Sequence, residues 1–162
     1  YNLASMSEAL SIRLRESLRE DLGGTYGASA SSSTALYPRP RFDIGVAFGC
    51  SPDRVDELVE RVFAEIRKLK GEGVPDDLLA KIKEGQRRQR ETDLEENGFW
   101  LSTLRFYDFH REDPGQILDL DTWIAGLTSD HIRDTARRYL DLENYVRVAL
   151  LPERMAPTSA SR

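Results

Sequence analysis

The two histidines, His110 and His131, are the first residues to consider for metal chemistry. Helical zinc sites place two histidines within one or two turns of each other, in patterns such as H-x-x-E-H or H-E-x-x-H. Twenty-one positions separate the two histidines here, and neither belongs to such a pattern. Cys50 is the only cysteine, so a cysteine-based metal cage and an internal disulfide are excluded. We therefore expect no metal ligands among these residues.

A second pair of candidate residues, Arg19 and Tyr26, lies in the segment Leu-Arg-Glu-Asp-Leu-Gly-Gly-Thr-Tyr-Gly. The arginine is predicted in the last turn of a helix, and the tyrosine at the start of a strand. A guanidinium group and a phenol both donate hydrogen bonds and can hold carbonyl oxygens. A structural interpretation also stays open, because arginine favours the C-terminal end of a helix and tyrosine is common in strands.

Hydrophobic spacing predicts the elements that would position these side chains. Leu10, Leu14 and Leu18 recur every four residues, which is typical of an amphipathic helix that Gly23 and Gly24 then end. Strict alternation over 42–50 predicts a strand. The predicted helices cover 3–18, 52–69, 76–94, 99–107, 114–124 and 129–140, and the predicted strands cover 25–35, 42–50 and 146–150.

Strands and helices segregate along the chain, which predicts an α+β fold with a mainly antiparallel sheet covered on one face by several helices. Residues 1–152 are expected to form one domain that is truncated at its N-terminus, and residues 153–162 a disordered tail. Three strands make a narrow sheet under so many helices. We expect one or two further strands before Tyr1 or from a neighbouring chain.

The composition narrows the classes of partner. The formal net charge is −5, whereas nucleic acids and anionic membranes require a basic face. The one basic run, Arg87, Arg88 and Arg90, lies among acidic residues and is interpreted as a solvated helix face. No apolar stretch approaches the roughly 18 residues that span a bilayer. Phosphate-binding loops of the Walker type and the nucleophile elbow G-x-S-x-G are also missing from the sequence.

Taken in order, these segments resemble the C-terminal region of the pitrilysin/insulinase (inverzincin) family of zinc metallopeptidases. The resemblance covers about residues 1–152. It starts with the helix, the L-R-E-x-L-G-x-x-Y-G segment and the small-residue strand, and continues through the helix that opens Ser51-Pro52-Asp53. It ends with the Thr128–Leu140 helix and the Asn144-Tyr-Val-Arg-Val segment. It implies the second-half fragment of a domain of that family, without the zinc motif.

The resemblance also implies a function. In that family an N-terminal half, in the same chain or a separate subunit, binds the zinc, and the C-terminal half closes over the peptide substrate. An arginine and a tyrosine at this spacing face the zinc, and Arg19 and Tyr26 are the matching positions, implied to be both catalytic and substrate-binding. Residues 1–162 alone, without the half that binds zinc, would be inactive. The resemblance is compatible with a periplasmic or secreted location, and the cytoplasm is not excluded.

Two other functions are left open by the residues. A non-catalytic scaffold of the same fold, as in the core subunits of the respiratory bc₁ complex, would need neither Arg19 nor Tyr26, so their presence favours the peptidase. Outside the family, the chain could be an α+β protein-interaction module. A closely packed interface between helix and sheet that leaves the Arg19/Tyr26 pair inaccessible would favour that alternative.

Overall fold

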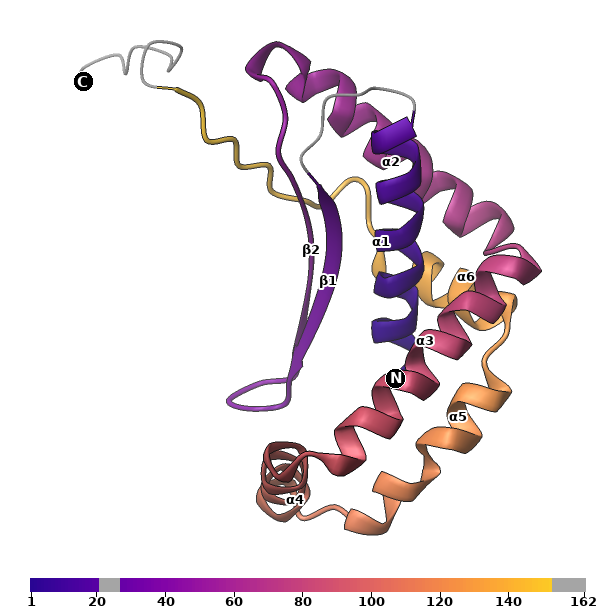
Figure 1. Ribbon diagram of the computed structural model, residues 1–162. Coiled ribbons are helices and arrows are strands. Elements are labelled where there is room, and N and C mark those ends of the chain that lie inside the picture. The colour runs from indigo at the N-terminus through magenta and orange to yellow at the C-terminus, as the bar shows by residue number, and fades with distance from the viewer. Residues whose placement is uncertain (21–26, 153–162) are drawn as a thin grey trace, which may run out of the picture.

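In the computed structural model, residues 1–20 and 27–152 are described, without the side chains of Arg19 and Glu20. Six α-helices and one β-hairpin follow one another as shown in Figure 1. The elements are α1 (Asn2–Glu20), β1 (Ala28–Ala35), β2 (Arg41–Phe48), the 3₁₀ turn η1 (Pro52–Arg54), α2 (Val55–Glu72), α3 (Asp76–Glu95), α4 (Asn97–His110), the 3₁₀ turn η2 (Pro114–Asp119), α5 (Leu120–Gly126) and α6 (Ser129–Tyr139).

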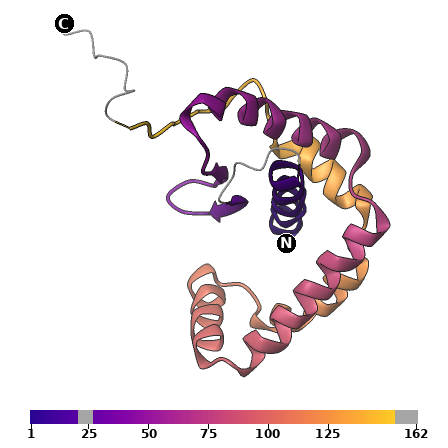
Figure 2. The same ribbon diagram turned by 45° about the horizontal axis from the view of Figure 1, so that its top comes forward.

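Helix α1 lies at the centre of the core. Met6, Leu10, Leu14 and Leu18 recur every four residues, and none of their side chains is exposed. A four-residue step keeps side chains on one helical face, so these residues form a continuous apolar stripe. The stripe packs between the hairpin and the helices α2 and α6 (Figures 1 and 2). The predicted first helix is confirmed.

The two strands form an antiparallel pair in register from Ala28 opposite Phe48 to Ala35 opposite Arg41. One face of the pair packs toward the core and includes Ala30, Ile44 and Val46. On the same face the hydroxyl of Ser32 donates a 3.4 Å hydrogen bond to the Leu3 carbonyl of α1. Small side chains at these positions in β1 let helix and strand approach closely. The predicted antiparallel arrangement is therefore confirmed for the first two strands.

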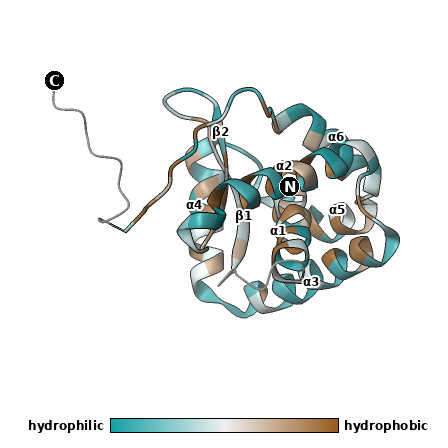
Figure 3. Ribbon diagram, turned by 90° about the horizontal axis from the view of Figure 1, so that it is seen from above, coloured by the Kyte–Doolittle hydropathy of each residue, from teal (hydrophilic) through white to brown (hydrophobic). Residues whose placement is uncertain are grey.

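A helical layer completes the core from the other side of α1. Leu58, Ile66 and Leu69 of α2 are buried together with Ile132 and Ala136 of α6. Along these helices apolar residues alternate with polar ones, as the hydropathy colours in Figure 3 show. The helices therefore cover one face of the hairpin, and the predicted α+β class is confirmed.

The connection between α2 and α3 is fastened to the start of α6. Gly73 ends α2 with φ of 73°, a conformation that glycine adopts without strain. Next to it, the Ser129 hydroxyl accepts a hydrogen bond from the Val74 backbone N–H (2.9 Å) and donates one to the Val74 carbonyl (2.7 Å). Thr128 caps α6 by accepting a hydrogen bond from the His131 N–H at 3.2 Å.

Helices α3, α4 and α5 form an arm that extends away from this core (Figure 1). Its central contact is Arg90, which is only 4 % exposed and donates a 2.6 Å hydrogen bond to the Ile117 carbonyl. The Arg90 guanidinium also lies 5.6 Å from the centre of the Phe99 ring. The interpretation of this arginine run as a solvated face was therefore wrong for Arg90, because the chain folds back over that side of α3.

The predicted closing strand over 146–150 was also wrong for this structure. Residues 142–152 contain no helix or strand, and among the described residues β1 and β2 make the whole sheet. Alternating apolar residues give a segment the propensity to be a strand, but a strand forms only where another one pairs with it. The tail 153–162 lies outside the described residues.

Candidate functional site

Arg19 and Tyr26 fall at the edge of what the structure describes. Arg19 belongs to the last turn of α1 by its backbone, whereas its side chain and the whole of Tyr26 lie outside the described residues. Leu18 of α1 is fully buried, and Ala28, the first residue of β1, is 7 % exposed. Helix α1 packs on β1, and in the sequence the two predicted residues fall between the buried stripe of α1 and the first residue of β1.

The end of α1 is fixed to α2 by polar contacts. Arg61 of α2 donates a 2.6 Å hydrogen bond from Nε to the hydroxyl of Ser17. One turn earlier, Arg13 donates from Nε to Glu65 Oε2 at 3.1 Å and from Nη1 to the Gly73 carbonyl at 3.0 Å. These contacts hold the helix against rotation about its own axis. The backbone of Arg19 therefore has a fixed direction.

Glu65 is the buried charge in this group, with 4 % of its surface exposed. Its second oxygen accepts a 3.0 Å hydrogen bond from Lys68 Nζ. Burial alone would raise the pKa of the Glu65 carboxyl, but the hydrogen bonds from Lys68 and Arg13 outweigh it. The pKa consequently lies below its ordinary value. The carboxylate stays charged at neutral pH and continues to link α1 to α2.

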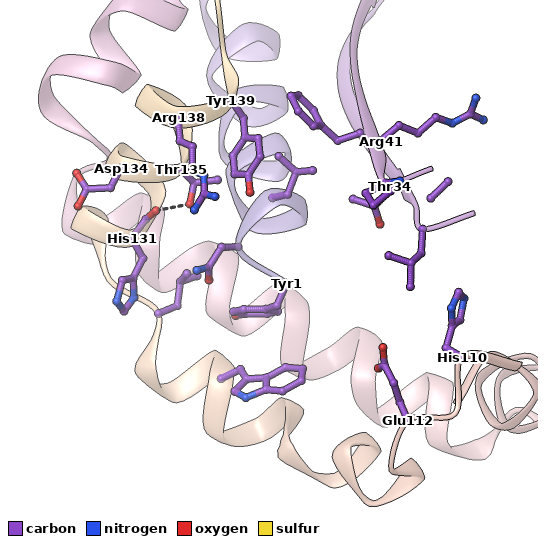
Figure 4. Close-up of a pocket in the computed structure, with 18 of the residues that line it drawn as sticks. Tyr1, Thr34, Arg41, His110, Glu112, His131, Asp134, Thr135, Arg138 and Tyr139 are labelled. Carbon is purple, nitrogen blue, oxygen red and sulfur yellow. Dashed lines mark hydrogen bonds between the residues drawn. The ribbon is translucent and has the colours of Figure 1, made fainter. Parts of the chain in front are cut away.

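A large cavity opens at the opposite end of α1. Its volume is about 1180 Å³, and it lies between the N-terminus of α1, the turn of the hairpin, the end of α4, and helices α5 and α6 (Figure 4). Aromatic rings form much of its wall. Phe42 meets Tyr139 at 4.9 Å between ring centres, and Tyr1 meets Trp123 at 6.1 Å. The Tyr1 hydroxyl donates a 2.6 Å hydrogen bond to Gln86 Oε1, and partial burial raises its pKa.

Both histidines line this cavity, but from different sides. His131 projects from α6 and His110 from the end of α4, with Tyr1 drawn between them in Figure 4. The His110 ring stacks on the Tyr37 ring, with 5.6 Å between the ring centres. Across residues 1–18 and 27–152, no three histidine, cysteine, aspartate or glutamate side chains are grouped to hold a metal ion. The residues that the structure describes therefore do not fit a zinc ion.

The cavity and the backbone of Arg19 lie at opposite ends of α1. Asn2 and Arg19 are seventeen positions apart, and at about 1.5 Å rise per residue the two ends of α1 are roughly 25 Å apart. Sequence reasoning missed the cavity, because its aromatic residues come from five distant segments. Each of them looks like an ordinary apolar position within its own element.

Comparison with known proteins gives the family. Residues 3–86 match the family described as "Peptidase M16 inactive domain". This match covers more than half of the chain and includes α1, the hairpin, α2 and the first half of α3. The chain therefore belongs to the peptidase M16 family and corresponds to its inactive, C-terminal domain. The predicted pitrilysin/insulinase resemblance is confirmed.

Individual relatives agree with this assignment. A "Zinc protease PQQL-like" protein of Arabidopsis thaliana is 28 % identical over 104 residues, which is 61 % of this chain and 11 % of that protein. The periplasmic protease PqqL from Escherichia coli shares the fold with a TM-score of 0.67 at 19 % identity. The match covers 86 % of this chain and 16 % of the PqqL chain. A protease from Helicobacter pylori has a TM-score of 0.70 at 17 % identity, and the match covers 87 % of this chain and 35 % of the protease chain.

The chain thus spans 11 % of the curated relative and 16 % and 35 % of these two solved chains. Within the described residues, no helix combines the length and apolarity that a membrane crossing requires.

Proposed function

We propose that this chain is the substrate-binding part of a zinc-dependent metalloendopeptidase, in which Arg19 and Tyr26 hold the peptide. The observation that carries the proposal is the Arg-x₆-Tyr spacing of Arg19 and Tyr26, which lies within the M16 family match, after the buried stripe of α1 and before β1 in the sequence. The anchoring of α1 by Arg13 and Glu65 supports it, because a group that binds a peptide must be held in a fixed direction.

The chemistry assigned to each side chain follows from its donors. Peptide hydrolysis develops negative charge on the carbonyl oxygen, and a donor aimed at that position lowers the barrier. In this proposal the Tyr26 hydroxyl donates to that oxygen. The Arg19 guanidinium, with several donors in one plane, orients the neighbouring substrate backbone. The zinc ion belongs to an N-terminal half, in the same chain or a separate subunit, since the described residues do not fit it.

The test is removal of one hydroxyl, Tyr26→Phe, in the longest natural polypeptide that contains these residues, together with its zinc-binding partner if that is a separate subunit. We expect kcat for a fluorogenic peptide to fall about 100- to 1000-fold, as for loss of one oxyanion donor, with an unchanged thermal midpoint. Tyr37→Phe is the matched control. Tyr37 is 59 % exposed in the turn after β1, and loss of its hydroxyl should leave turnover unchanged.

Two results would contradict the proposal. Equal turnover of Tyr26→Phe and Tyr37→Phe would remove Tyr26 from the catalytic residues. A polypeptide that contains both halves and bound zinc but hydrolyses no peptide would favour the alternative of a non-catalytic scaffold.

A further inference from the structure

Helix α4 lies at the end of the arm, away from the core around α1 (Figure 1). Seven of its fourteen residues are aromatic or leucine, and none of its residues is buried. The inner side of the helix is held by its neighbours. The Phe99 ring lies over the Arg90 guanidinium, and Trp100 Nε1 donates a 2.9 Å hydrogen bond to the Leu94 carbonyl. The position of α4 is therefore set by contacts on one side, while much of its apolar surface stays uncovered.

The uncovered side of α4 is a continuous patch, which we call the outer face. Steps of three and four residues place side chains in neighbouring rows on a helix. Leu101, Leu104 and Asp108 form one such row, and Leu101, Arg105 and Phe109 form the next. Leu101, Leu104 and Phe109 are 63 %, 47 % and 69 % exposed. The outer face therefore combines three exposed apolar side chains with two charged ones.

The negative charge of the chain is concentrated around this helix. Residues 91–126 contain nine acidic and two basic residues, whereas the rest of the chain contains 19 acidic and 21 basic residues. Glu95 and Glu96 directly precede α4, Asp108 lies within it and Glu112 follows it, and all four residues are exposed. Among the described residues, no lysine or arginine forms an ion pair with these four carboxylates. They give the surroundings of the outer face a negative potential, which attracts a basic partner.

The structure of α4 also narrows the shape of the partner. Its backbone hydrogen bonds are made within the helix, so a partner meets side chains only. A second helix with an apolar stripe packs along such a surface, and basic residues beside the stripe would lie near the four carboxylates. A second copy of this chain would bring the same negative charge against itself.

The charges on the outer face favour a partner that binds and leaves. Permanent interfaces are more apolar and are depleted in charged residues at their centre. Here Arg105 and Asp108 lie directly among the apolar side chains. A surface of this mixed kind remains compatible with water when no partner is bound.

We propose that the outer face of α4 is a docking surface for a basic amphipathic helix of a separate polypeptide. The apolar stripe of that helix covers Leu101, Leu104 and Phe109, and its lysine or arginine residues pair with the carboxylates at the two ends of α4. This inference goes beyond the proposed peptidase function and does not depend on Arg19, Tyr26 or zinc.

Peptide binding to the longest natural polypeptide that contains these residues tests the proposal. The probe is a fluorescent 18-residue peptide of leucine and lysine at helical spacing, and binding is followed by anisotropy. We expect a Kd of roughly 10–100 μM, as for a small transient interface. The double variant Leu101→Ser, Leu104→Ser should weaken binding at least about 10-fold, because it removes the apolar contact. Leu150→Ser is the matched control, since Leu150 is 97 % exposed on the segment after α6.

The charge contribution is tested separately. Glu95→Gln with Glu96→Gln should raise the Kd about 3- to 10-fold in dilute salt, and the difference should shrink as salt screens the charges. Glu60→Gln, an exposed site on α2, should leave the Kd unchanged. A peptide with glutamate in place of lysine should not bind.

Several results would overturn the proposal. These are no binding at about 1 mM peptide, equal binding by the Leu101/Leu104 and Leu150 variants, and equal binding of the lysine and glutamate peptides. Maleimide labelling of Leu101→Cys, in a Cys50→Ser background, tests for a permanent cover. We expect the labelling rate of an exposed thiol, and protection would show that the same polypeptide covers α4. A dimer in sedimentation that the double leucine variant dissociates would show that a second copy does so. Either result would likewise overturn the proposal.

Discussion

Replacing Glu65 by glutamine tests whether the buried ion pair, and not only apolar packing, holds α1 against α2. Glu65 accepts hydrogen bonds from Arg13 at 3.1 Å and from Lys68 at 3.0 Å, and its side chain is 6 % exposed. In Glu65→Gln the amide oxygen can still accept from Arg13. The bond is then no longer assisted by the negative charge, and the Arg13 guanidinium, 14 % exposed, loses its counter-ion.

The expected cost follows from these two bonds. A hydrogen bond between charged groups contributes about 1.5–3 kcal/mol and a neutral one about 1 kcal/mol, so the Arg13 bond loses roughly 1–2 kcal/mol. Lys68 is half-exposed, and its ion pair contributes less than about 1 kcal/mol. We expect the free energy of unfolding to fall by about 2 kcal/mol, which corresponds to a decrease of roughly 4–8 °C in thermal midpoint for a domain of this size.

The assay is urea unfolding of the 162-residue chain at pH 7, followed by circular dichroism. Glu60→Gln is the matched control on the same helix. It removes the same charge from a side chain that is 73 % exposed and lies 4.0 Å from Arg67, and it should change the unfolding free energy by less than about 0.5 kcal/mol. If both variants unfold at the same urea concentration, the stabilising role of the Glu65 contacts is refuted.

Two further predictions concern the same region. Because the pKa of Glu65 is lower in the folded chain than its ordinary value of 4.5, its contribution is complete above that pH and is lost as the pH falls through the folded value. The difference between wild type and Glu65→Gln in urea unfolding should therefore shrink below about pH 4.5, and a difference that stays constant down to pH 2 would contradict this. Gly73→Ala should destabilise the chain by about 2 kcal/mol or more, since φ is 73° and the added carbon would lie 2.5 Å from Ser129 Oγ. Gly71→Ala adds the same methyl group at a helical position with nothing within 4 Å, and should be neutral or stabilising by up to about 1 kcal/mol. Equal thermal midpoints for the two alanine variants would show that the turn after α2 tolerates a side chain.

Much of the fold was predictable because it depends on local spacing. The four-residue step of Leu10, Leu14 and Leu18 defines the buried side of α1 without knowledge of its neighbours. Alternation in β2 likewise predicts which side chains face the core. Features set by distant segments were not predictable. Arg90 looks like Arg87 and Arg88 in the sequence, and only the return of the chain at Ile117 buries it.

The candidate functional residues likewise include some that the sequence could indicate and some that it could not. The donors Arg19 and Tyr26 could be named from their spacing and a family resemblance, because both lie in one short segment. The cavity could not be predicted, since Phe42 and Tyr139 are nearly one hundred residues apart and meet only in the folded chain. For residues 146–150 the sequence indicates the propensity for a strand but does not identify its partner.

The packing of α1 against α6 has a consequence for biosynthesis. These are the first and last helices of the described residues, and the buried stripe of α1 is covered in part by Ile132 and Ala136. A ribosome makes α1 long before it makes α6. Leu10 and Leu14 therefore lack their contacts with α6 while more than one hundred residues are added to the chain. During that interval the nascent chain is open to aggregation and to binding by chaperones. Slow translation near residue 129 would prolong this exposure.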